Sequence, residues 1–221
     1  MRFSILLILA YSALLLSCND SEDPIDPSVA TYDVTFTFTW SQDNFPVEYP
    51  SNPHFSRLIG WSHSNTTEFF QEGTIASPGI RQMAETGGPS ILSNEIEDRI
   101  AAGEGIHLVS GSGLGDGVGE ISIVVDVTAE YPSVTLATMI APSPDWYVAV
   151  VNINLTESGE FVSSRTIEAG SYDAGTDSGN SYNSSNQATT PPEAIQVITD
   201  APLGDGTGVS PALATVTFTR R

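Results

Sequence analysis

The 221-residue chain contains no lysine, only seven arginines and a single cysteine. Its 27 aspartates and glutamates give it a formal net charge of −20 at pH 7. With so few cations, the chain cannot form the basic surface that nucleic acids or anionic membranes require. A lone cysteine cannot form an internal disulfide, so a fold stapled by disulfides is excluded. The charge balance instead favours cations or basic surfaces as partners.

The longest apolar run extends from Phe3 to Leu16 and follows the positively charged Arg2. It is too short for a lasting membrane span, and it has the flanks of an export signal. The run ends in "LLSC", which resembles the lipobox of bacterial lipoproteins. This resemblance implies a signal peptide at residues 1–17 and a lipid attached to Cys18. The alternative, that Cys18 is only a small residue in an apolar run, stays open.

Residues 18–30, "CNDSEDPIDPSVA", are acidic and contain two prolines. Such a segment can bury little apolar surface, so it predicts a tether. Acidic residues just after a lipidated cysteine also resemble the surface-export signal of Bacteroidota lipoproteins, although a plain solvated linker explains them equally well. We expect an exported protein anchored by lipid to the cell envelope at the outer membrane, with surface exposure left open.

Residues 31–221 are expected to form one domain, because no repeat or break in composition divides them. In residues 32–40, large apolar side chains alternate with polar ones, which is the period of a strand with one buried face. Similar runs occur at residues 120–128, 133–140, 146–155, 160–167 and 212–219. This spacing predicts an all-β fold, an antiparallel β-sandwich.

Two short helices are expected between the strands. In "SPGIRQMAETGG", Ser77 is the expected N-cap, Pro78 the first helical residue and Gly87 the stop. In "SNEIEDRIAAG", Ser93 or Asn94 can serve as the N-cap; only Asn94 places an acid at the third helical position.

The segment from Gly103 to Gly119 is rich in glycine and is expected to end the second helix and form an exposed loop. It does not fit the spacing of a nucleotide-binding G-x-G-x-x-G motif. The histidines have no i, i+4 pair and no neighbouring cysteine, which argues against a zinc site. His63 is expected to be buried and hydrogen-bonded. No catalytic constellation is found, so we do not expect an enzyme.

The polar stretch "YDAGTDSG" places Asp173 and Asp177 four residues apart in a glycine-rich turn. Calcium takes six to eight oxygen ligands, and Gly175 and Gly179 would let the backbone curl around such an ion. The EF-hand pattern is absent, so a third carboxylate should come from elsewhere, with Asp145 of "APSPDWYV" as a candidate. The alternative, that these aspartates are solvated turn residues, stays open.

Six stretches together resemble the spondin N-terminal domain, the family of F-spondin and mindin: "WSQDNFPVEYP", "FSRLIGWSHS", "SPGIRQMAETG", "APSPDWYV", "YDAGTDSGNSY" and "ATVTFTRR". The resemblance implies an antiparallel β-sandwich, an extracellular role in adhesion, and calcium bound by Asp145, Asp173 and Asp177. Phe55 stands where animal members usually have tryptophan. The animal domains carry cysteines, whereas the single cysteine of this chain has no disulfide partner. They are also followed by thrombospondin-type repeats that are not evident here, so the adhesion functions of animal spondins are expected to carry over poorly.

The resulting hypothesis is a calcium-binding envelope lipoprotein that recognises an extracellular protein or glycan. A second hypothesis is a carbohydrate-binding accessory protein with Tyr147, Tyr172 or Tyr182 as sugar platforms, although local packing of these rings explains them as well. A third is a hydrolase with a calcium-supported fold, for which no acid or nucleophile is located.

Overall fold

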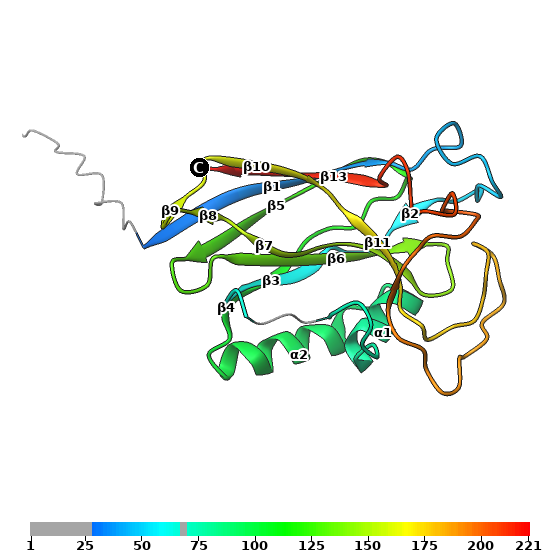
Figure 1. Ribbon diagram of the computed structural model, residues 1–221, viewed down its shortest axis with the longest axis horizontal. Coiled ribbons are helices and arrows are strands. Elements are labelled where there is room, and N and C mark those ends of the chain that lie inside the picture. Colours follow the sequence, from blue (N-terminus) through cyan, green and yellow to red (C-terminus); the bar gives the residue numbers. More distant parts are fainter. Residues whose placement is uncertain (1–27, 67–69) are drawn as a thin grey trace, which may run out of the picture.

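The computed structural model describes residues 28–66 and 70–221, which form two packed β-sheets with two helices against one of them (Figure 1). The predicted signal peptide, Cys18 and most of the predicted tether lie outside these residues. The first sheet has four antiparallel strands in the order β10 (Ser164–Glu168), β13 (Ala214–Arg220), β1 (Val29–Thr39) and β5 (Val118–Thr128). β1 therefore begins two residues before the domain start at residue 31 that the sequence suggested.

The second sheet has its main strands in the order β12 (Gln196–Val197), β11 (Gly170–Asp173), β7 (Trp146–Asn154), β6 (Ser133–Ala141), β3 (Ile59–His63) and β4 (Gly105–Ser110). β2 (His54–Phe55) also pairs with β6, and a separate small hairpin joins β8 (Thr156–Glu157) to β9 (Glu160–Phe161). The pairings are antiparallel. The predicted fold class, an all-β antiparallel sandwich with two short helices, is confirmed.

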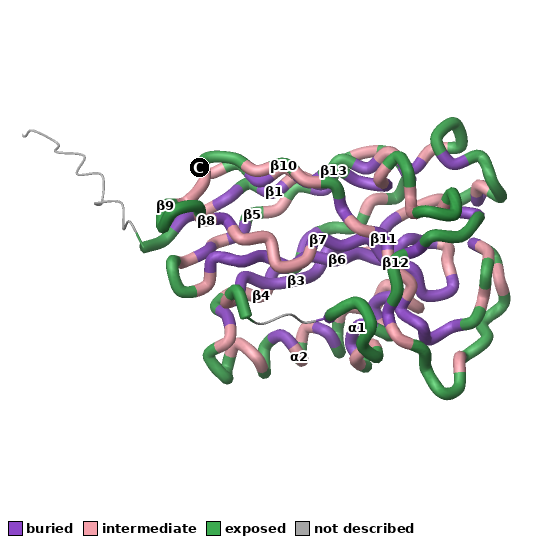
Figure 2. The backbone as a smooth tube through the Cα atoms, in the orientation of Figure 1, coloured by how far each residue is buried: buried purple, intermediate pink, exposed green. Residues whose placement is uncertain are grey.

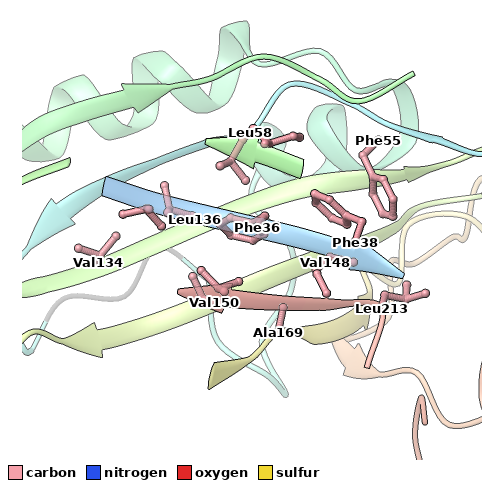
Figure 3. Packing of buried hydrophobic residues seen from close by; sticks show 14 of the residues in the cluster. Phe36, Phe38, Phe55, Leu58, Val134, Leu136, Val148, Val150, Ala169 and Leu213 are labelled. Carbon is pink, nitrogen blue, oxygen red and sulfur yellow. The ribbon is translucent and has the colours of Figure 1, made fainter. Parts of the chain in front are cut away.

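The main core lies between the two sheets. On β1 the alternating residues Tyr32, Val34, Phe36 and Phe38 are all buried, and the threonines between them face outward. Figure 3 shows Phe36 and Phe38 among apolar residues such as Leu136 of β6 and Val148 of β7. The burial of alternate residues in β1 therefore agrees with the prediction made from the two-residue period of the sequence.

Helices α1 (Pro78–Thr86) and α2 (Ser90–Ala101) cover the outer face of the second sheet and form a second core there (Figure 1). Because β6 is covered on both faces, all nine of its residues are buried. Figure 2 shows this as a continuous buried band through the centre of the molecule. Neither helix of the described chain is long and apolar enough to cross a membrane.

α1 has the predicted ends. Ser77 caps its start, accepting a hydrogen bond from the Ile80 amide, and Gly87 ends it in the left-handed conformation with φ 68°. Glu95 of α2 also binds this start, because its carboxylate accepts hydrogen bonds from the Ser77 hydroxyl and the Gly79 amide. A negative charge at a helix N-terminus is favourable.

The prediction for the start of α2 was wrong. The helix begins at Ser90, before both Ser93 and Asn94, and the residue before it, Pro89, makes no side-chain cap. The capping partner comes from α1 instead, where the Gln82 side-chain oxygen accepts hydrogen bonds from the Ser90 hydroxyl and the Ile91 amide. A cap from another helix leaves no local signal in the sequence.

The prediction for residues 103–119 was also wrong in part. Residues 105–110 form β4, which pairs with β3, and Val109 is buried. β5 begins at Val118, so only residues 111–117 remain as a connection. The glycine content of this segment predicted a loop. β4 could not be predicted from it, because this strand forms by pairing with β3.

The two ends of the sandwich differ. β1 enters the sheet at Val29, near the C-terminus, and runs the length of the molecule (Figure 1). At the opposite end lie the loop after β1, the turn from β6 to β7 and the long connection from β11 to β13 (Figure 1). These loops carry the candidate site.

Candidate metal centre

The pairing of β7 with β11 brings Asp145 and Asp173 to one place. Asp173, the last residue of β11, lies opposite Trp146, the first residue of β7. Asp145 directly precedes Trp146, and its carbonyl oxygen accepts a hydrogen bond of 3.2 Å from the Ala174 amide. Two carboxylates that are 28 positions apart in the sequence therefore meet where these two strands join their loops.

Asp145 is fully buried. Its Oδ2 accepts three hydrogen bonds, from the Thr176 amide at 2.6 Å, the Thr176 hydroxyl at 3.0 Å and the Asp177 amide at 3.0 Å. Its Oδ1 is buried and has no hydrogen-bond donor. Burial first, and then the negative charge of Asp173, raise the pKa of Asp145 to about 6.

Asp173 and Asp177 occupy two similar turns. Asp173 Oδ1 accepts from the Gly175 amide and Asp177 Oδ1 from the Gly179 amide, each at 2.8 Å and each two residues ahead. The second oxygens accept from the Trp146 indole at 3.0 Å and from the Gln187 amide at 2.9 Å, respectively. These Asx turns fix both carboxylates in a glycine-rich loop.

The charge around Asp173 is uncompensated. Burial raises the pKa of this carboxyl, hydrogen bonds from Gly175 and Trp146 lower it, and the negative charges of Glu193 and Asp177 raise it again. The net shift is upward. The site therefore contains neighbouring acids that disfavour one another's ionisation, which is the cost that a bound cation would remove.

Gly175 is required by the backbone of this loop. It has φ 71°, in the left-handed region, and a Cβ atom there would collide with the carbonyl oxygen of Glu193. That carbonyl belongs to the chain segment that returns alongside the turn, since the Glu193 amide donates to the Gly175 carbonyl at 2.8 Å. The glycine thus permits both the turn and its packing.

The residues fit a hard cation by their chemistry, although they are not arranged as a finished cage. Within residues 28–66 and 70–221, no group of three or more His, Cys, Asp or Glu side chains is positioned to hold a metal ion. Five of the six carboxylate oxygens accept hydrogen bonds instead. A carboxylate oxygen can accept a hydrogen bond and ligate an ion with its other lone pair, and Asp145 Oδ1 has both lone pairs free.

Two neighbours of the site were not singled out from the sequence. Thr176 binds Asp145 through both its amide and its hydroxyl, and Glu193 adds negative charge beside Asp173. Thr176 lies inside the quoted "DAGTDSG" stretch, so its position was visible there. Glu193 had no such signal, because the loop that carries it reaches the site only in the folded chain.

The proposed sugar platforms are not exposed rings. Tyr147 and Tyr182 are buried, with 0% and 2% of their surface accessible. Tyr172 is half-buried and stacks on Tyr147, with 5.4 Å between ring centroids. Sugar binding to an aromatic ring needs an open face, so these residues do not support the carbohydrate hypothesis.

Comparison with known proteins finds a matching family model and several similar proteins. The family model Spondin_N matches residues 30–205. Over 178 residues the chain is 34% identical to spondin-2 of Homo sapiens and 35% identical to spondin-2 of Rattus norvegicus, covering 79% and 77% of this chain. It is 32% identical to spondin-1 of Rattus norvegicus over 77% of this chain. The matched region spans 54%, 53% and 22% of those relatives, respectively.

Proposed function

Because the chain belongs to the spondin N-terminal domain family, we propose that it is a calcium-binding recognition or adhesion domain of the cell envelope. Its role is binding and not catalysis. Calcium is held by Asp145, Asp173 and Asp177, and it supplies positive charge that neutralises the acids and orders their loops. The ligand is an extracellular protein or glycan.

One observation carries the calcium assignment. The Oδ1 atom of Asp145 is buried and receives no hydrogen bond, and the carboxylate of Asp173 places a second negative charge nearby. An unpaired buried carboxylate oxygen costs stability, and the usual remedies are a hydrogen bond, an ion pair or a metal ion. Each arginine within residues 28–66 and 70–221 contacts a group other than Asp145, so an external cation is the simplest partner.

The expected contribution of calcium to stability is small. With a dissociation constant on the order of 10⁻⁴ to 10⁻³ M, as in extracellular calcium modules, millimolar calcium adds roughly 0.4 to 1.4 kcal/mol by mass action. Calcium should therefore act mainly by ordering the loops that present the recognition surface.

The test is a calorimetric titration of the purified protein with calcium chloride. Replacing Asp173 by asparagine should weaken binding at least about tenfold, because an amide oxygen carries no net charge for the ion. Asp116→Asn is the matched control, since Asp116 Oδ1 also accepts from an amide two residues ahead, that of Val118. Equal calcium binding by both variants and the parent would refute the site.

The proposed lipid anchor would hold the site away from the membrane. Cys18 is joined to the domain through Val29, and the calcium loops lie at the opposite end of the sandwich (Figure 1). Metabolic labelling with a radioactive or clickable fatty acid tests this anchor. The parent chain should incorporate the label and Cys18→Ser should not, whereas an unlabelled parent would rule the anchor out.

A further inference from the structure

A groove lies between three loops at the same end of the molecule as the calcium residues. Two pockets, of about 250 and 290 Å³, form it, and both are lined by Asn180 and Ala201. The first pocket extends to Trp146 and Asp200, and the second extends to Val47, after β1. We call this feature the interloop groove. It is lined by residues 47–48, 179–181 and 196–202, together with Trp146, Asp173 and Glu193.

The interloop groove is acidic. Glu193 and Asp200 line its first pocket together with Asp173, and Glu48 lines its second. None of the residues that line either pocket is lysine, arginine or histidine. The groove therefore presents a concave, negatively charged surface, which attracts positively charged ligands.

The six arginines within residues 28–66 and 70–221 make their contacts elsewhere and do not line this surface. Arg57 donates to the Gly111 carbonyl, and Arg81 and Arg221 bind Glu85 and Asp33. Arg165 donates to the Asn154 carbonyl, Arg220 lies over the Phe161 ring and Arg99 over the Trp61 ring. The complementary positive charge therefore has to come from outside the described part of the chain. Calcium would supply it at Asp173, and a bound ligand would supply it at Glu48, Glu193 and Asp200.

Apolar surface accompanies these charges. Val47 in the second pocket is 49% exposed and Val197 in the first is 39% exposed. A pair of exposed valines beside carboxylates suits a side chain with an apolar stem and a cationic head. Arginine has this form, and its stem can bury against apolar surface while its guanidinium binds carboxylates.

Other ligand classes fit less well. Acidic glycans and nucleic acids are repelled by Glu48, Glu193 and Asp200, the groove carboxylates that the proposed calcium site does not use. Neutral sugars would need an open aromatic face, but Trp146, the aromatic residue that lines the first pocket, is only 5% exposed. The second pocket has no aromatic residue in its lining. The composition thus favours a cationic peptide over a glycan.

We propose that the interloop groove binds a segment of an extracellular partner protein that carries two arginines, one for each pocket. Asp200 binds the first guanidinium and Glu48 the second, and the stems pack on Val197 and Val47. This inference rests on the proposed recognition function and names its partner class. The loops that line the groove lie at the end of the sandwich opposite the start of β1, where the chain enters the domain, so a partner can approach them (Figure 1).

The test measures fluorescence anisotropy of a labelled Gly-Arg-Gly-Arg-Gly peptide with the purified protein in 0.15 M salt. A second peptide has citrulline in place of both arginines, which keeps the shape and removes the charge. The arginine peptide should bind at least tenfold more tightly. The double variant Glu48→Gln/Asp200→Asn should weaken arginine-peptide binding by about three- to tenfold, as expected for two exposed ion pairs.

The control removes two charges from another face. Glu120 and Glu168 lie on the exposed side of the four-stranded sheet, in β5 and β10. Glu120→Gln/Glu168→Gln should change peptide binding by less than twofold. Equal losses in the two double variants would mean diffuse attraction to an acidic protein and would overturn the groove, as would equal binding of the citrulline peptide or no binding of either peptide.

A calcium titration of Glu48→Gln/Asp200→Asn separates this inference from the calcium proposal. Unchanged calcium affinity together with weakened peptide binding supports the groove. If the parent protein binds the arginine peptide but not calcium, the metal proposal fails and the groove stands. If it binds calcium but does not discriminate between the peptides, the groove fails and the metal proposal stands.

Discussion

Trp146 and Asp173 face each other across the β7–β11 pair, and the Trp146 indole donates a hydrogen bond of 3.0 Å to Asp173 Oδ2. The Trp146 ring also contacts Tyr182 edge-on, with 5.6 Å between centroids, and Tyr182 lies 5.4 Å from Trp40. The proposed calcium loop is thus attached to the aromatic part of the main core. A change at this carboxylate should be transmitted to Trp146.

Calcium should therefore change the fluorescence of Trp146. An ion on Asp173 withdraws electron density from the carboxylate that accepts the indole hydrogen bond, so the emission maximum should shift. Trp146→Phe should abolish the shift while calorimetry still detects calcium. Trp61→Phe is the control, because Trp61 lies in β3 under Arg99 and in the second core. A shift that survives in Trp146→Phe would show that the signal has another source.

Asp145 should make the calcium-free protein less stable as the pH rises. Its pKa is about 6 in the folded protein against an ordinary value of 3.8. A raised pKa gives stability that is complete below pH 3.8 and is lost as the pH rises through 6. The difference of about two units corresponds to a loss on the order of 3 kcal/mol.

The variant Asp145→Asn isolates this effect, because asparagine does not ionise. In chelator, the free energy of unfolding of the parent minus that of the variant should fall between pH 4 and pH 7. Urea denaturation at several pH values measures this difference. Millimolar calcium should make the parent lose less stability as the pH rises, and it should have no such effect on Asp145→Asn. A difference that is constant with pH would show that Asp145 does not carry the buried charge.

Gly175→Ala should destabilise the protein by about 2 to 4 kcal/mol, since it combines a left-handed backbone with a collision against the Glu193 carbonyl. Gly103→Ala is the matched control, with φ 80° and open space around the added methyl group. That control should cost about 1 to 2 kcal/mol. Thermal or urea unfolding measures the stability of both variants. An equal loss of stability in the two would contradict a collision between the added methyl group and the Glu193 carbonyl.

His63 should contribute an opposite dependence on pH. It is buried; its Nδ1 donates to the Ser64 carbonyl at 2.7 Å, and its Nε2 accepts from the Thr135 hydroxyl at 2.8 Å. Burial lowers the pKa of His63 from 6.5 to about 4. Because the folded state disfavours the charged ring, the stability is complete above pH 6.5 and is lost as the pH falls toward 4.

The expected loss is about 3 kcal/mol. His63→Gln keeps a polar side chain that does not titrate in this range, although it should lower stability at every pH. The free energy of unfolding of the parent minus that of the variant should fall between pH 7 and pH 4.5. If the free energies of unfolding of the parent and of His63→Gln change with pH in parallel, the pKa of His63 is the same in the folded and unfolded states, and the prediction fails.

Much of the fold could be predicted from local pattern. β1 follows from the alternation in residues 32–40, and α1 follows from Ser77, Pro78 and Gly87, because these signals act through the backbone of the same few residues. β4 and the start of α2 could not be predicted, since the first depends on pairing with β3 and the second on a side chain of α1. Burial of His63 was predicted and is confirmed.

The candidate site shows the same division. The sequence by itself determined which acids can converge, because the glycine turn fixes Asp173 and Asp177 at a short spacing and proline-rich residues precede Asp145. Only the tertiary structure decided that Asp145 would be buried with one oxygen unpaired, that Glu193 would lie beside Asp173, and that loops from three regions would form one acidic groove. The physical reason is that burial and electrostatic fields depend on which segments meet in space, and strand pairing across the sheet sets those meetings.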